Sequence, residues 1–253
     1  MSRPAEIEVV ADGEAPARRA AEAFASAARR AVSERGLFTV ALSGGATPRA
    51  AYGLLAAEPL RSAIAWERVH LFWGDERCVP PEHSDSDYGM AHEALIAHVP
   101  IPPENVHRLH GEDDPGEAAR AYAAELRSAV PARAASRADL PVLDLVLLGL
   151  GDNGHTASLF PHSAALHETE RLVVATEVDA AVRRRLTVTV PVINAAREVV
   201  FLVQGAAKAD VVRRVLEGPY EPDELPAQLV APDPGRLTWL LDEAAASALD
   251  RGR

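Results

Sequence analysis

The chain has 253 residues and a formal net charge of -11 at pH 7, and its length suits either one large α/β domain or two small ones. This acidity excludes non-specific binding to nucleic acid or to anionic membranes, because such binding depends on patches of lysine and arginine. The single cysteine, Cys78, excludes an intrachain disulfide and any metal site built from several thiolates of one chain.

Apolar runs of strand length alternate with alanine-rich stretches of helical period, which is typical of a mainly parallel sheet with helices on both faces. The N-terminal segment enters an expected strand at 7–10 without the features of a signal peptide, and no apolar run approaches the roughly 18 residues of a membrane span. We therefore expect a cytoplasmic protein. The first half further predicts strands over 38–42, 69–73 and near 106–110, a polar loop over 74–87, and helices over 14–35, from Pro48, over 86–98 and over 116–130.

The longest apolar run, residues 143–150, does not alternate and is predicted to be a central strand buried on both faces. The alanine- and arginine-rich segment 131–141 is the one candidate domain boundary, and we interpret it as a surface connection. The sequence thus predicts a single α/β domain over 1–253, with an open, mainly parallel sheet. The second half predicts strands over 171–178, 184–193, 198–204 and 236–241, and helices over 206–218 and 226–230.

The turn SGGATP, residues 43–48, lies between a predicted strand and a predicted helix. Thr47 is placed as the N-cap and Pro48 at the first helical position. Gly44 and Gly45 allow backbone N–H groups to approach an anion, which the helix dipole also attracts. The turn is a candidate phosphate site, and a purely structural glycine turn is an equally good interpretation.

Charged residues follow the predicted strand 69–73, at the end of the strand where α/β sheets bind ligands. Asp75 is a candidate to position a sugar hydroxyl group or an attacking water, and Arg77 to bind a phosphate through two hydrogen bonds. A solvated charge cluster is the alternative interpretation. Arg185 and Lys208 also lie beside predicted strands. Lys208 is the only lysine among 26 basic residues, which indicates either a role that arginine cannot fill or chance.

The segment GLGDNGHTASLFP, residues 149–161, carries the strongest candidate for catalysis. Its glycines fit the dinucleotide-binding pattern G-x-G-x-x-G, but Pro161 interrupts the helix that should follow the third glycine. The alternative is a tight turn that presents His155 at the end of the central strand. A mostly neutral histidine there suits base catalysis, and a hydrogen-bonded structural histidine is the competing interpretation.

Neighbouring side chains favour neither a metal site nor a covalent serine mechanism. His162 and His167 lack the i, i+4 spacing that would place them beside His155 on one helix face. Ser158 is not part of a G-x-S-x-G elbow. We therefore expect no metal.

Six segments in order, LSGGATP, FWGDERCVP, SDYGM, GLGDNGHTASLFP, RRLTVTVPVINAA and GAAKADVV, resemble the 6-phosphogluconolactonase family over about residues 20–245. The resemblance implies the Rossmann-like open sheet shared with glucosamine-6-phosphate deaminases, and hydrolysis of 6-phosphogluconolactone. No cofactor is expected, because a lactone is an activated ester. The resemblance places the catalytic base on His155, its acidic partner on Asp75, and the phosphate-binding residues on Ser43, Gly44, Gly45, Thr47, Arg77, Arg185 and Lys208.

Two positions separate this chain from its expected relatives. Family members commonly have aspartate where this chain has Asn153, and we interpret Asn153 as a residue that shapes the turn. An amide would make His155 less basic if the usual carboxylate charges the histidine. Phe160 stands where the deaminases need an acid, which argues against deamination.

Three other functions remain open at this point. They are an amino-sugar-phosphate deaminase or isomerase, a non-catalytic sugar-phosphate sensor, and an NAD-linked enzyme. The sensor would need a DNA-binding or partner domain, which the 253 residues do not suggest. We expect a small sugar-phosphate lactone as the ligand, no nucleic-acid or membrane partner, and a monomer or small homo-oligomer.

Overall fold

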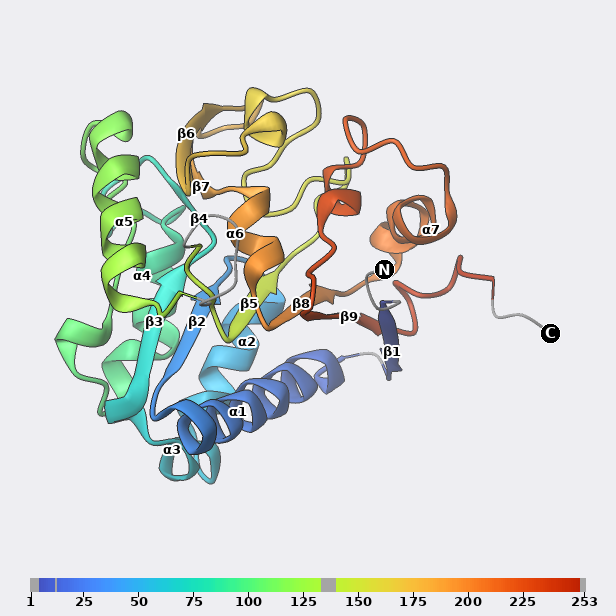
Figure 1. The fold of residues 1–253 in the computed structure, drawn as a ribbon. Coiled ribbons are helices and arrows are strands. Elements are labelled where there is room, and N and C mark those ends of the chain that lie inside the picture. Colours follow the sequence, from blue (N-terminus) through green and yellow to red (C-terminus); the bar gives the residue numbers. More distant parts are fainter. Residues whose placement is uncertain (1–4, 12, 133–139, 251–253) are drawn as a thin grey trace.

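The computed structural model describes residues 5–11, 13–132 and 140–250. Its larger sheet has six strands in the order β1-β9-β8-β5-β2-β3, and all the strand pairs within it are parallel (Figure 1). The predicted central strand is confirmed, because β5 lies between β8 and β2 and is buried along its whole length. The strands of this sheet are β1 (Glu6–Val10), β2 (Phe38–Leu42), β3 (Val69–Trp73), β5 (Leu145–Leu148), β8 (Glu198–Val203) and β9 (Arg236–Asp242).

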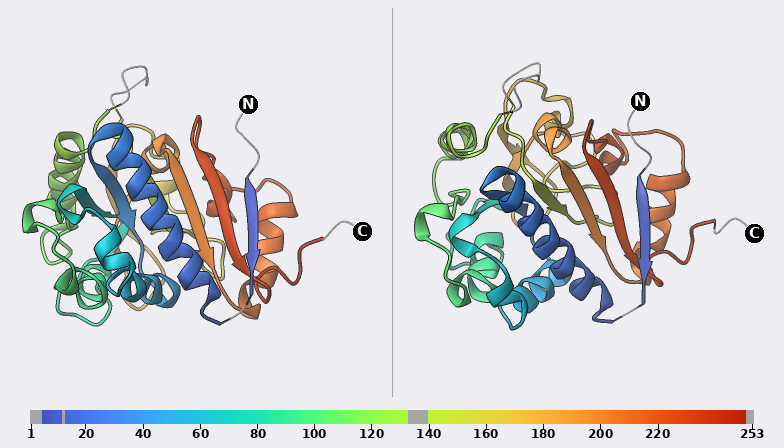
Figure 2. Two further views of the ribbon diagram at one scale, coloured as in Figure 1. Left: turned by 90° about the horizontal axis from the view of Figure 1, so that it is seen from below. Right: turned by 60° about the horizontal axis from the view of Figure 1, so that its bottom comes forward.

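Helices cover both faces of this sheet, as predicted. The long helix α1 packs an alanine-rich face, with Phe24 fully buried, against one side, and α7 lies on the other (Figure 2). Helix α1 ends at Gly36, whose positive φ of 80° suits glycine. None of the described helices is long and apolar enough to cross a membrane. The α-helices are α1 (Ala15–Arg35), α2 (Ala46–Leu55), α3 (Leu60–Ala63), α4 (Asp87–Ala94), α5 (Pro115–Ala129), α6 (Val190–Ala195) and α7 (Ala209–Glu217).

A second, antiparallel sheet was not predicted from the sequence. It has the order β4-β7-β6, formed by β4 (Asp75–Arg77), β7 (Arg184–Val188) and β6 (Val173–Glu177). The prediction of a continuous polar loop over 74–87 is therefore wrong. Three charged residues carry no strand pattern of their own, and β4 forms because β7 offers backbone partners. The pairing sets Arg77 directly opposite Arg185.

Other predicted elements also differ from the structure. The helix expected over 206–218 begins with a 3-10 turn, Ala206–Lys208, and the one expected over 226–230 is a 3-10 turn, Pro226–Leu229. The strand expected over 184–193 ends with β7, and α6 follows it, with Pro191 in the first turn, where a proline costs no hydrogen bond. The strand expected near 106–110 is one bridge, between Leu71 and Val106. The helix expected over 86–98 divides into α4 and a 3-10 turn, Ile96–His98. Residues 133–139 of the connection expected over 131–141 lie outside the described residues.

Candidate functional site

A cavity of about 480 Å³ lies at the carboxyl ends of the central parallel strands. Segments that follow β2, β5 and β8 form much of its wall, as expected for a ligand site in an α/β sheet. Eight of the nine predicted site residues line it, and Arg185 does not. A larger cavity, of about 750 Å³, is lined by α4 and the segments on either side of it and contains none of the nine. The smaller cavity is therefore the candidate active site.

The turn after β2 begins helix α2 earlier than predicted. Gly45, with a φ of 112°, is the N-cap, so the prediction of Thr47 as N-cap and Pro48 as first helical residue is wrong. A residue with a side chain rarely adopts this φ, which explains why glycine begins the helix. The Thr47 hydroxyl group instead donates to Gln204 Oε1 at 3.0 Å. The free N–H groups of the first turn of α2 thus lie at the cavity wall.

Hydrogen bonds to the backbone of Ser43 fix its position and leave its side-chain hydroxyl group available to a ligand. The buried Tyr52 hydroxyl donates to Ser43 O at 2.9 Å and accepts from Ser43 N at 3.1 Å. Among the described residues, the buried Oγ of Ser43 has no hydrogen-bond partner, and the same is true of Arg77 Nε. Two unpaired donors in one cavity wall indicate a ligand that offers acceptor oxygens.

His155 is held on two sides. Its ring stacks on Phe160, with centroids 3.9 Å apart and planes 12° from parallel. Its Nδ1 lies 2.6 Å from Asn153 Oδ1, which also accepts the His155 backbone N–H at 3.2 Å. An amide oxygen has no hydrogen to donate, so the ring is the donor in this contact; Nδ1 therefore carries the hydrogen, and Nε2 of the neutral ring is unprotonated. Asn153 therefore shapes the turn, as interpreted from the sequence, and also sets the tautomer of the ring.

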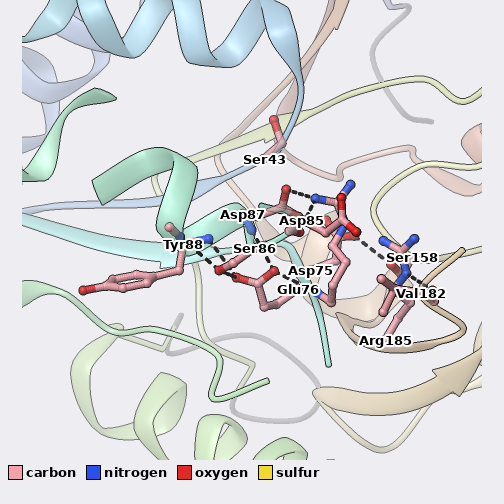
Figure 3. Close-up of polar contacts among 12 residues, drawn as sticks. Ser43, Asp75, Glu76, Asp85, Ser86, Asp87, Tyr88, Ser158, Val182 and Arg185 are labelled. Carbon is pink, nitrogen blue, oxygen red and sulfur yellow. Dashed lines mark hydrogen bonds and ion pairs between the residues drawn. The ribbon is translucent and has the colours of Figure 1, made fainter. Parts of the chain in front are cut away.

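The surroundings keep His155 neutral. The pKa of His155 is lowered to about 4, mainly by burial; the charges of Lys208 and Arg185 act in the same direction, while Asp75 opposes them. Asp75 is itself buried and accepts a hydrogen bond of 2.7 Å from Ser158 (Figure 3). A neutral ring next to a fixed carboxylate is able to accept a proton and then be stabilised as a cation.

Two of the predicted cations reach the cavity, each beside a carboxylate. Arg77 forms an ion pair with Asp87, and Lys208 Nζ lies 2.5 Å from Asp152 Oδ1. Arg185 lies opposite Arg77 on β7, where its Nε donates to the carbonyl oxygen of residue 182 at 2.9 Å. Arg185 does not line the cavity, but its positive charge acts on the site, since it lowers the pKa of His155.

Sequence reasoning did not single out Glu76 or Asp87, which organise this wall. Asp87 lines the cavity, and Glu76 is buried beneath it. The one available signal was the pair Ser86 and Asp87 before a helix, since Ser86 is the N-cap of α4. The ion pair with Arg77 depends on tertiary structure alone.

Metal ligation has no visible support in the described part of the chain. No group of three or more histidine, cysteine, aspartate or glutamate side chains there is arranged to hold a metal ion. The expectation of a metal-free site remains a prediction.

Residues 11–239 match the family described as glucosamine-6-phosphate isomerases/6-phosphogluconolactonase. The chain belongs to this family. It is 44% identical to a 6-phosphogluconolactonase of Synechocystis sp. over 221 residues, which cover 87% of this chain and 88% of that protein. It is 41% identical to the human 6-phosphogluconolactonase over 217 residues, which cover 85% of this chain and 82% of that protein.

Solved structures bear out the predicted fold. The 6-phosphogluconolactonase of Trypanosoma brucei superposes with a TM-score of 0.88 at 30% identity, covering 99% of this chain and all of that one. A monomeric glucosamine-6-phosphate deaminase superposes with a TM-score of 0.79 at 21% identity, covering 96% of this chain and all of that one. The open α/β sheet shared with the deaminases is thereby confirmed.

Proposed function

We propose that the protein hydrolyses 6-phospho-D-glucono-1,5-lactone to 6-phospho-D-gluconate, the second step of the oxidative pentose phosphate pathway. The observation that carries the proposal is a neutral His155, with Nε2 unprotonated, in a cavity that also holds Arg77 and Lys208. A base beside phosphate-binding cations suits an ester whose reacting carbon is several bonds from a phosphate group. The names of the relatives support the same substrate.

In the proposed mechanism, His155 Nε2 removes a proton from a water molecule as its oxygen attacks the C1 carbonyl carbon. The tetrahedral intermediate then collapses, the bond from C1 to the ring oxygen breaks, and the imidazolium returns the proton to that oxygen. Asp75 stabilises the transient imidazolium through its charge, since this carboxylate raises the pKa of His155. No metal or organic cofactor takes part in any step.

We place the substrate's phosphate group on the turn 43–47, with Arg77, Lys208 and, beside Arg77 on β7, Arg185. The first turn of α2 supplies backbone N–H groups, and the unpaired Ser43 hydroxyl supplies another donor. Binding the remote phosphate in this way would fix C1 close to His155, so that binding energy serves the reaction. We further propose that the chain acts in the cytoplasm as a single domain, 1–253, and as a monomer or small homo-oligomer.

The decisive test is hydrolysis of freshly prepared 6-phosphogluconolactone, followed by acid release and corrected for the spontaneous rate. We expect turnover by the wild type well above that rate. The same preparation incubated with glucosamine 6-phosphate should release no ammonia, because the apolar ring of Phe160 stacks on the histidine where a deaminase needs an acid. Tight binding of the sugar phosphate without turnover would instead favour the sensor.

Replacing Asn153 by aspartate should make the enzyme more sensitive to acid. A carboxylate on Nδ1 would raise the pKa of His155 by roughly 1–2 units, from about 4. The base acts only above its pKa, so the acid limb of kcat should move to higher pH by the same amount. A kcat profile from pH 4 to 8 measures this. An acid limb that stays at the wild-type pH would mean that the contact with Asn153 does not affect the reacting base. Asn153→Ala is the control: it introduces no carboxylate, so it should not move the acid limb to higher pH.

Replacing Lys208 by arginine should raise KM about three- to tenfold while kcat stays nearly constant. Lys208 is mostly buried at the cavity and contacts Asp152 as a compact point charge, and a planar guanidinium group needs more room. Steady-state kinetics with the lactone measure both constants. An unchanged KM would mean that the single lysine of the chain survives by chance.

A further inference from the structure

The carboxylate of Glu76 is the most completely hydrogen-bonded acid beside the cavity. It lies on β4 between Asp75 and Arg77, and only 1% of the residue is exposed. Because side chains alternate along a strand, Glu76 points away from the cavity that its two neighbours line. Figure 3 shows it beneath Asp87 and Ser86, at the start of α4.

Four donors converge on this carboxylate, two on each oxygen. Oε1 accepts from the backbone N–H groups of Arg77 and Asp87, both at 2.8 Å. Oε2 accepts from Tyr88 N at 2.7 Å and Ser86 Oγ at 3.1 Å. Glu76 thereby joins strand β4 to the first turn of a helix about ten residues further along the chain.

Burying this charge is unfavourable by itself. Burial raises the pKa of Glu76, and the four hydrogen bonds oppose that rise. No cation among the described residues forms an ion pair with it, so backbone and hydroxyl donors alone compensate the charge. An apolar side chain in the same space would cost less free energy of burial than a carboxylate. This indicates that the carboxylate is there to position a neighbouring group.

The group that Glu76 positions is Asp87. Its backbone N–H is bound by Glu76, while its carboxylate forms the ion pair with Arg77. The same carboxylate lies against Gly44, where a Cβ would overlap it, so only glycine fits there. Asp87 is therefore the point at which β4, α4 and the turn after β2 meet.

We propose that Glu76 is a positioning residue that fixes the Arg77–Asp87 pair on the cavity wall, so that Arg77 is held ready for the substrate's phosphate group. For the substrate, this inference rests on the proposed function. His155 and Asp75 are held by other contacts, with Asn153 and Ser158. Loss of the Glu76 carboxylate should therefore raise KM, which reflects substrate binding, more than it lowers kcat, which reflects the chemical step.

The test is a double-mutant cycle with Glu76→Gln, Asp87→Asn and the double variant. In Glu76→Gln, an amide NH₂ group replaces one carboxylate oxygen. It cannot accept the two hydrogen bonds that this oxygen accepted, so two donors lose their partner. We expect KM to rise about tenfold, with kcat within about threefold of the wild type, because charge-assisted hydrogen bonds are lost. In the Asp87→Asn background, the same change should alter KM by less than about twofold, because the pair it positions is already broken.

A residue that only stabilises the fold would behave differently. Glu76→Gln would then lower the melting temperature and leave KM unchanged, or raise KM by the same factor in both backgrounds, and either result overturns the proposal. If Glu76→Gln does not fold, Ser86→Ala replaces it, since it removes one of the four donors. We expect KM to rise about threefold there, and an unchanged KM overturns the proposal.

A matched control and a second readout separate this inference from the proposed function. Glu125→Gln also neutralises a hydrogen-bonded glutamate, but that residue contacts His107 and does not line the cavity, so KM and kcat should not change. The cycle is repeated with inorganic phosphate by calorimetric titration. If the wild type fails to hydrolyse the lactone, the proposed function fails. The inference then depends on whether Glu76→Gln weakens phosphate binding only when Asp87 is present.

Discussion

Replacing His155 by alanine should lower kcat for 6-phosphogluconolactone by about 10²–10⁴-fold, the usual contribution of a positioned general base. The loss should be confined to chemistry, because the cations that we assign to the phosphate, Arg77 and Lys208, hold their own carboxylate partners and do not depend on the imidazole. KM, and the dissociation constant of inorganic phosphate, should stay within about twofold. Steady-state kinetics and calorimetric titration of the same protein preparation measure these quantities.

His167→Ala is a suitable control for this experiment. His167 is mostly exposed, pairs with Asp223 and does not line the cavity, so its removal deletes an imidazole without touching the site. We expect wild-type kinetics from it. Turnover retained by His155→Ala would exclude His155 as the base. An equal loss of phosphate affinity in His155→Ala would mean that the histidine organises the cavity and does not act on water.

Sequence reasoning succeeded for the fold where a local pattern determines the element. Strand β2 was predicted to the residue, because a mainly apolar run, in which Thr39 is the one polar residue, lies between Gly36 and the polar turn at Ser43. Strand β4 was missed, because three charged residues become a strand only by pairing with β7, more than one hundred residues away. Helix α6 was predicted as strand because its valines and isoleucine favour strands. Pro191 lies in the first turn of this helix, a position that suits proline, and the segment is helical.

The same distinction holds for the site. Residues directly after parallel strands were predicted to lie together, and those at Ser43, Asp75 and His155 do line one cavity. Arg185 was predicted beside them; it lies directly opposite Arg77 but is not among the residues that line the cavity, and this position follows from the antiparallel pairing with β4. Glu76 depends on that pairing and on the packing of α4 as well. No spacing in the sequence encodes either contact.

Replacing Gly151 by alanine should lower kcat about 100-fold through the position of the histidine ring. A Cβ at this glycine would overlap the His155 ring at Nδ1 and Cε1, so the imidazole must move. Displacing a catalytic group by about 1 Å is enough to cost about 10²-fold in rate. Gly151 is not among the glycines with positive φ, so the backbone itself tolerates alanine. The contacts that hold Arg77 and Lys208 are untouched, and KM should change little.

Gly149→Ala adds the same methyl group to the same turn without this collision. No atom lies within 4 Å of a Cβ built there, apart from its chain neighbours. Gly149 lines the same cavity as Gly151, so the two added methyl groups should affect KM to the same small extent, while kcat of Gly149→Ala stays close to that of the wild type. Equal losses of kcat in both variants would mean that the turn as a whole responds to substitution. A loss in Gly151→Ala alone would trace the rate to the position of one imidazole, which the glycine leaves room for and Asn153 orients.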